Sequence, residues 1–191
     1  MNEPSLVPLG PVRPRAHTRR ERQATRQRRQ RPTIDIRVES ALWKKKPSAP
    51  TLLRRTIRQA ASAVFLTHAE VSIVLADDAA VRELNRTWRH RDAPTNVLSF
   101  PAHPGAADRA GPRFLGDIVI AYQTVAREAS MQRKSFAQHL AHLAVHGFLH
   151  LVGYDHQTDA EATAMEQLET LILGRLDVPD PYRVRDIAAE P

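Results

Sequence analysis

The alternation of apolar and polar residues divides the chain into strands and helices. Ile34, Ile36 and Val38 alternate with charged residues, which is the period of a half-buried strand. Four segments have a strand pattern, and we predict strands over 34–38, 70–76, 97–100 and 115–121. Pro101 ends the third strand. The fourth has almost no polar interruption, so we expect it in the centre of the sheet.

Apolar residues spaced three or four apart predict the helices. These cover residues 51–65, 77–89, 123–130 and 135–152, and a last helix runs from the capping box at Thr158 to Gly174. Asp77 or Asp78 caps the second helix. We expect these side chains to face inward: Val81, Leu84, Trp88, Met165, Leu168, Leu171 and Ile172. The order of elements predicts an α+β (mixed α/β) fold, a single domain over 33–178 with about four strands in a mixed sheet and about five helices.

The two ends of the chain have a different composition. Residues 1–32 hold nine arginines, two acidic residues and five prolines. This segment accounts for the whole net charge of +7, because the remaining residues include 19 basic and 19 acidic ones. We predict a disordered basic arm over 1–32, a loose tail over 179–191 and an irregular loop over 102–113. Lys44-Lys45-Lys46 and the two prolines that follow predict a further loop. The arm attracts RNA phosphates, or is a solvated extension, a stretch that precedes the real start codon or an organellar transit peptide.

Composition also limits the compartment. The chain has no cysteine, which excludes disulfides and thiolate metal sites and fits a cytoplasmic protein. No apolar run reaches the length of a membrane span, and the N-terminus lacks the apolar segment of a secretory signal. We therefore expect a cytoplasmic protein with no membrane partner.

Three histidines in the spacing H-x3-H-x5-H are the strongest chemical signal. His146 and His150 share one helix face, and Gly153 lets the chain turn back so that His156 can reach the same point. Three imidazoles with one position open form the ligand set of a catalytic zinc. The competing interpretation is a set of hydrogen-bonded structural histidines in a chain that has nine.

The residue after His146 narrows the class of reaction that the site could catalyse. Metzincin proteases have the same histidine and glycine spacing, but their second residue is the glutamate that acts as general base. Here that position is Gly147. A protease is therefore disfavoured, and a phosphoryl substrate polarised by the metal fits better.

Further polar residues are candidates for the same site. Arg89 and Arg91 lie close in sequence to Asn96 and Ser99, and arginine binds phosphate in a bidentate manner, although a solvated loop explains the pair equally well. Asp117 lies inside an apolar strand and needs a partner, either a histidine or an arginine. Asp155 is either an acceptor for a ligand histidine or a turn residue, and His142 is an alternative ligand, a base or a core histidine.

These residues resemble the YbeY family of endoribonucleases. The family signature is similar to H-G-x-L-H-L-x-G-Y-D-H, and residues 146–156 match it at every fixed position. Further blocks that resemble the family are Leu84-Asn85, Trp88-Arg89, Asp92, Thr95 to Pro101, Leu115 to Ile120, Met165-Glu166 and Leu168-Glu169. The resemblance covers about residues 33–175, and the arm before Thr33 lies outside it.

The resemblance implies one zinc ion held by His146, His150 and His156, with Arg89 as the residue that faces the phosphate. It implies a single-strand-specific endoribonuclease that matures the 3′ end of 16S ribosomal RNA and acts in ribosome quality control, with the small ribosomal subunit and associated proteins as partners. The alternative is a ribosome-assembly binding protein whose metal is structural and which has no nuclease activity. A metallohydrolase for a small molecule or peptide is a third hypothesis.

Overall fold

The computed structural model describes residues 31–103 and 111–183, and in this part a four-stranded sheet forms the centre. The strands are β1 (Thr33–Val38), β2 (Ala69–Ala76), β3 (Val97–Pro101) and β4 (Arg113–Ala121), in the spatial order β1-β2-β4-β3. β1, β2 and β4 are parallel, and β3 is antiparallel to β4. The sheet is mixed, and β4 is internal, as the sequence predicts.

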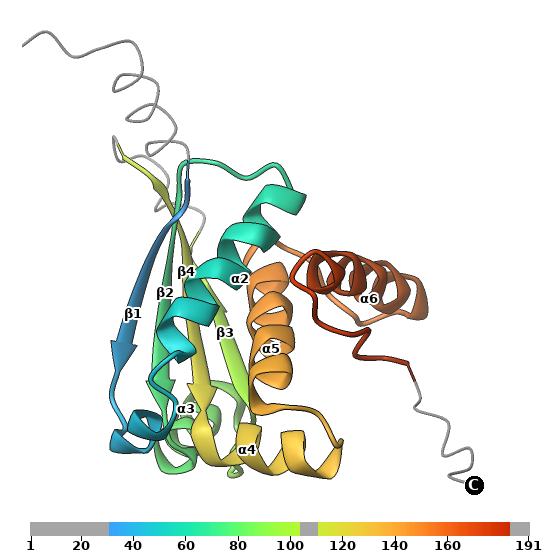
Figure 1. Ribbon diagram of the computed structural model, residues 1–191. Helices are drawn as coiled ribbons and strands as arrows, with labels where there is room; N and C mark the ends of the chain where they lie inside the picture. The colour runs from blue at the N-terminus through green and yellow to red at the C-terminus, as the bar shows by residue number, and fades with distance from the viewer. Residues whose placement is uncertain (1–30, 104–110, 184–191) are drawn as a thin grey trace, which may run out of the picture. The chain divides into compact units, whose positions relative to one another are not determined.

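Helices lie on both faces of the sheet (Figure 1). One face carries α2 (Ala49–Ala63) and α5 (Phe136–Leu151), and α6 (Asp159–Gly174) packs on α5. The other face carries α3 (Asp78–Arg89), which begins with Asp77 as its side-chain cap. A short helix, α4 (Tyr122–Met131), follows β4 directly. The α+β class and the single domain with four strands and five α-helices are confirmed.

The two faces of the sheet have separate apolar clusters. The larger cluster packs Ile73, Ile118 and Ile120 against α2 and α5. The smaller one packs Val74 and Val119 against α3. Since neighbouring residues of a strand point to opposite faces, β4 contributes side chains to both clusters.

A register shift adjusts β4 to its neighbour. Glu70 pairs with Phe114, but Val71 pairs with Gly116, so one extra residue, Leu115, is inserted in β4. Leu115 and Ile118 consequently both belong to the larger cluster although an odd number of positions separates them. Beyond this point the alternation places Asp117 and Val119 on the α3 face.

Three local predictions were wrong. The segment around Lys44 and Lys45 is not a plain loop but a 3-10 helix, η1 (Ala41–Lys45), whose Trp43 is buried and donates from Nε1 to the carbonyl of Ala76. Trp88 is 68% exposed and Leu171 48% exposed, although both have the spacing of inward residues. α3 and α6 each present a narrower buried face than the apolar pattern suggests.

Several predictions concern residues outside the described part. The basic arm lies there up to residue 30, as do residues 104–110 of the predicted loop and residues 184–191 of the predicted tail. Among the described residues, no helix is both long enough and apolar enough to cross a membrane.

Candidate metal centre

The central helix α5 presents two histidines and then ends so that a third can follow. Ser135 and Gln138 form a capping box at its start. At its end, the N–H of Tyr154 donates to the carbonyl of Leu149 and the N–H of Gly153 to that of His150, which is the Schellman arrangement. Gly153 has a φ of +95°, which a side chain would disfavour. This turn returns the chain toward the helix.

The three predicted histidines meet at this turn. One ring nitrogen from each of His146, His150 and His156 lies within 4.8 Å of the others, and the Nε2 atoms of His146 and His150 are 3.1 Å apart. Two ligands of one tetrahedral ion at about 2.0–2.1 Å are separated by about 3.3 Å. The pair therefore already has a spacing suited to one ion. His156 is exposed, and its ring centroid lies 5.5 Å from that of His146 and 5.0 Å from that of His150.

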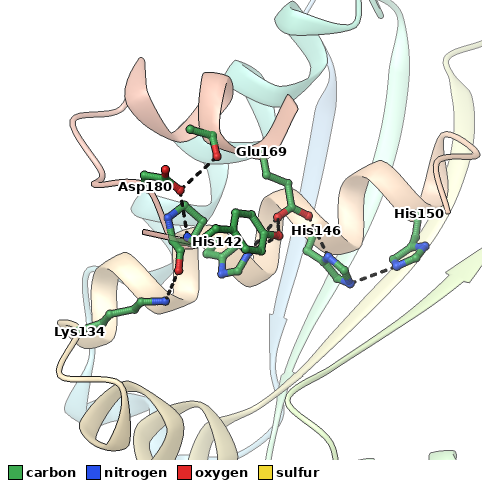
Figure 2. A network of polar contacts seen from close by, with 9 residues as sticks. Lys134, His142, His146, His150, Glu169 and Asp180 are labelled. Carbon is green, nitrogen blue, oxygen red and sulfur yellow. Dashed lines mark hydrogen bonds and ion pairs between the residues drawn. The ribbon is translucent and has the colours of Figure 1, made fainter. Parts of the chain in front are cut away.

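A buried carboxylate orients the first histidine. Glu169 of α6 is fully buried, and its Oε1 lies 2.8 Å from Nδ1 of His146 (Figure 2). An Nδ1–H that donates to Glu169 leaves the lone pair on Nε2, on the side of His150. This is the tautomer that a metal ligand needs, and a carboxylate behind a ligand histidine is a recurring feature of metal sites.

The charges of the centre favour a neutral His150 beside an ionised Glu169. Burial alone would raise the pKa of Glu169, but hydrogen bonds with His142, His146 and Tyr182 outweigh burial and lower it to about 2. Burial, together with the neighbouring His146 and His156, lowers the pKa of His150. A metal binds the neutral form of histidine, so these residues fit a divalent cation.

His142 belongs to this network but lies behind the three histidines. Its Nε2 is 2.9 Å from Oε2 of Glu169 and 3.3 Å from the hydroxyl of Tyr182. Tyr182 also donates to Glu169, and Lys134 donates to the carbonyl of Pro181. Residues 179–183, which the sequence pattern assigns to a loose tail, thus pack beside the centre. His142 supports Glu169 and is not one of the three converging residues.

Gly147 faces the sheet instead of the centre. A Cβ atom at this position would lie 3.0 Å from Oγ of Ser99 and 3.1 Å from Cγ2 of Ile118. The glutamate that metzincins have here would not fit without displacing β3 and β4. The absence of that base therefore has a packing cause, because α5 lies directly on the strands.

Ser99 of the edge strand β3 is hydrogen-bonded both to this helix and to Arg89 of α3. The hydroxyl of Ser99 donates to the carbonyl of Gly147 at 3.1 Å, between the two histidines of α5. Nη2 of Arg89 lies 3.5 Å from the carbonyl of Ser99, and the Arg89 side chain is exposed at the end of α3. Arg89 is one strand away from the histidine helix and presents its remaining N–H groups to solvent.

Asn96 lines a small polar cavity next to the centre. Its Nδ2 donates to Glu128, whose carboxylate is also 2.8 Å from Nε2 of His139. The cavity measures about 250 Å³ and is lined by Asn96, Glu128, Gln132, His139, His142, Leu143, His146 and Tyr182. Asn96 is therefore near the candidate metal site, but its side chain is engaged in holding α4 and the start of β3 together.

Asp117 is on the wrong side of the sheet for the role proposed from sequence. Ile118 packs under Gly147 of α5, so the preceding residue points to the opposite face, where it lies beside Phe100. The hypothesis that Asp117 orients a ligand histidine was wrong, because the register of β4 separates it from α5. Within the described residues it also has no arginine partner.

Asp155 shapes the turn that carries His156. Its carboxylate accepts hydrogen bonds from the backbone N–H of His156 at 2.9 Å and from the side chain of Gln157 at 2.7 Å. The first of these bonds is the largest cause of its lowered pKa. The structure favours the turn interpretation over a direct contact with a ligand histidine.

The sequence interpretation missed Glu169 as a site residue. The family resemblance includes Glu169 in the last helix but implies no chemical role for it. The available signal is that a glutamate lies four residues after Met165 and three before Ile172, both buried. A charged residue on the buried face of a helix needs a partner, and the histidines of α5 are the nearest candidates.

The fold is α+β, and three histidines that could hold a metal ion converge at the end of its central helix. Comparison with known proteins is more specific, since residues 37–177 match the family model described as Endoribonuclease YbeY. This chain belongs to the YbeY family.

Curated relatives agree with this assignment over most of their length. A Bradyrhizobium sp. (strain BTAi1) protein named Endoribonuclease YbeY is 50% identical over 160 residues, which is 81% of this chain and 95% of that protein. A relative of the same name from Rhodopseudomonas palustris (strain BisA53) is 51% identical over 161 residues, 82% of this chain and 94% of that protein. The solution structure of TM1509 from Thermotoga maritima is more distant, with 22% identity and a TM-score of 0.48 over 83% of this chain and all of that one.

Proposed function

We propose that this chain is a zinc-dependent endoribonuclease that cuts single-stranded RNA. The observation that carries the proposal is the convergence of His146, His150 and His156, with His146 oriented by the buried Glu169. Membership of the YbeY family and relatives named as endoribonucleases support the choice of RNA as substrate. A zinc ion held there would supply a Lewis acid for the phosphodiester.

The residues of the chain would act by binding and orientation. Glu169 holds His146 in one tautomer, and the exposed His156 borders the side open to solvent. Arg89 is suited to contact a phosphate oxygen, because its guanidinium makes one weak hydrogen bond, to Ser99, within the described residues. The bonds from Arg89 to the carbonyl of Ser99 and from the Ser99 hydroxyl to the carbonyl of Gly147 link this cation to the histidine helix.

We further propose, on the resemblance alone, that the RNA is the 3′ end of 16S ribosomal RNA in the cytoplasm. The small ribosomal subunit and its associated proteins would then be the partners. The alternative, a ribosome-assembly protein with a structural metal, would require a closed metal site. The described part of the chain contains a three-residue group in which His156 is exposed, and this favours the enzyme.

The test is a cleavage assay on highly purified protein of measured metal content. We expect loss of cleavage of a single-stranded RNA after chelation and recovery with zinc. Arg89→Ala should lower kcat/KM about 100-fold, as expected for the loss of a cation on a developing phosphate charge, and Arg89→Lys should recover only part of it. Arg58→Ala, in α2, is the matched control. Equal cleavage by chelated and zinc-loaded protein would refute the proposal.

A further inference from the structure

A second and larger cavity lies on the face of the sheet opposite to α5. It measures about 670 Å³, within the range of small-molecule sites. Its lining residues are Arg37, Glu39, Val74, Ala76, Ala80, Leu84, Trp88, Ser99, Phe100, Pro101, Asp117 and Val119. We call it the Trp88 groove. None of the three converging histidines lines it, so the candidate metal site does not account for it.

An exposed aromatic surface forms one wall of the groove. Trp88 is 68% exposed at the end of α3, and its ring meets Phe100 of β3 edge to face, with the centroids 6.3 Å apart. Val74 and Val119 form an apolar floor. Such a surface suits a flat, partly apolar ligand that stacks on an aromatic ring.

The floor of the groove also carries a carboxylate, that of Asp117, to which no described residue donates a hydrogen bond. Asp117 is half-buried in β4, and no described residue forms a hydrogen bond or an ion pair with its carboxylate. An ionised carboxylate among apolar side chains is unfavourable unless hydrogen-bond donors compensate for its lost hydration. A ligand with two adjacent N–H groups would satisfy both oxygens.

The charges around the groove are mixed, since its lining carries one arginine, Arg37, and two carboxylates, Glu39 and Asp117. On α3, Arg82 is paired with Asp92 and Arg86 with Glu83. Arg37, which lines the groove, and Arg89, next to Trp88, have no acidic partner within the described residues. A ligand that has phosphates outside and donor groups inside matches this distribution.

The groove and the histidine centre lie on the two sides of one edge strand. β3 is the last strand of the sheet, with Phe100 lining the groove and Ser99 bonded to Gly147 of α5. Arg89 binds the carbonyl of Ser99. A nucleic-acid strand that crosses β3 would therefore meet the groove, the arginine and the histidines in succession.

We propose that the Trp88 groove binds one nucleobase of the RNA, with guanine preferred. The base stacks on Trp88, and Asp117 accepts hydrogen bonds from N1–H and the 2-amino group of guanine. Adenine, cytosine and uracil each lack this pair of adjacent donors on the Watson–Crick edge, so the carboxylate discriminates against them. The proposal rests on the RNA-cutting function above and assigns a specificity residue to it.

Tryptophan fluorescence of the zinc-loaded full chain tests the groove without cleavage. Trp43 is 3% exposed and Trp88 is accessible, so a stacked base quenches mainly Trp88. GMP, AMP, CMP and UMP carry the same phosphate, so the ratio of their dissociation constants isolates the base. We expect GMP to bind about tenfold more tightly than AMP, and Asp117→Asn to bring the ratio close to one. Asp35→Asn, an exposed strand residue outside the groove, should leave the ratio unchanged.

Cleavage of a randomised single-stranded RNA library provides the second measurement. Trp88→Ala should raise KM at least about fivefold, and Phe65→Ala, at an aromatic residue that is 93% exposed elsewhere, should not. Cleavage with the same base preference in wild type and Asp117→Asn would overturn the groove proposal and leave the nuclease intact. A wild type that binds GMP selectively but cuts no RNA would refute the nuclease and support the groove. If Asp117→Asn reduced binding to ribosomal subunits but not to GMP, the groove would be a protein-binding surface and the proposal would fall.

Discussion

Replacement of the buried Glu169 by glutamine tests the organisation of the candidate metal centre. The carboxylate accepts from His142, His146 and Tyr182, and its pKa of about 2 compares with an ordinary value of 4.5. This difference corresponds to roughly 3 kcal/mol of preference for the ionised form in the folded protein. Because the folded pKa is depressed, this contribution is present above pH 4.5 and is lost as the pH falls toward 2.

Two effects of Glu169→Gln follow from this geometry. An amide carries no charge and its NH₂ group cannot accept the N–H of a histidine, so we expect metal-free protein at pH 7 to lose about 2–3 kcal/mol of unfolding free energy. Since the amide offers one acceptor oxygen for the three donors, His146 is held less firmly in the tautomer with a free Nε2, and we also expect zinc affinity to fall about 10- to 100-fold.

The assays are urea unfolding of the metal-free protein and zinc competition with a chromophoric chelator. Because the unfolding assay uses metal-free protein, bound metal does not contribute to the measured stability. Glu166→Gln, an exposed glutamate of the same helix, is the matched control and should change neither quantity appreciably. A folded Glu169→Gln protein whose zinc dissociation constant is within twofold of wild type would refute the argument that Glu169 orients a ligand.

Two further predictions concern stability. Burial lowers the pKa of His139 more than Glu128 raises it, so below pH 6.5 the unfolded chain takes up a proton more readily than the folded one. The urea midpoint should therefore decrease as the pH is lowered from 7.5 to 5.5. A His139→Gln variant with the same pH dependence as the wild type would contradict this cause. Gly147→Ala should lower the free energy of unfolding by about 1–3 kcal/mol, because the new Cβ would press on Ser99 and Ile118. Gly174→Ala is the control and should not destabilise the protein, since no atom lies within 4 Å of its new Cβ. Equal unfolding free energies of the two variants would contradict the packing described.

Periodicity predicted most of the fold because each element buries a continuous face. The central β4 is an example, since both of its faces are covered and its sequence is correspondingly apolar. The convergence of the three histidines also followed from local rules, namely the helical spacing of His146 and His150 and the turn at Gly153. Their role as metal ligands stays a prediction.

The errors arose where tertiary packing decides. Trp88 has the spacing of a core residue, but it lies in the last turn of α3, where its ring meets Phe100 of the edge strand and stays 68% exposed. Asp117 was assigned to the histidines because strand position alone does not tell which face a residue occupies, and one inserted residue in β4 reverses that choice. Glu169 is separated from His146 by 23 positions, and a contact at that distance has no local signature.

The short edge strand has a consequence for how the protein behaves at high concentration. β3 has only five residues and ends in Pro101, which has no N–H to offer. An exposed strand margin is normally a template for sheet extension by another molecule, and brevity and proline are two common protections against it. The same margin can thus stay uncovered for a substrate without promoting self-association into fibrils.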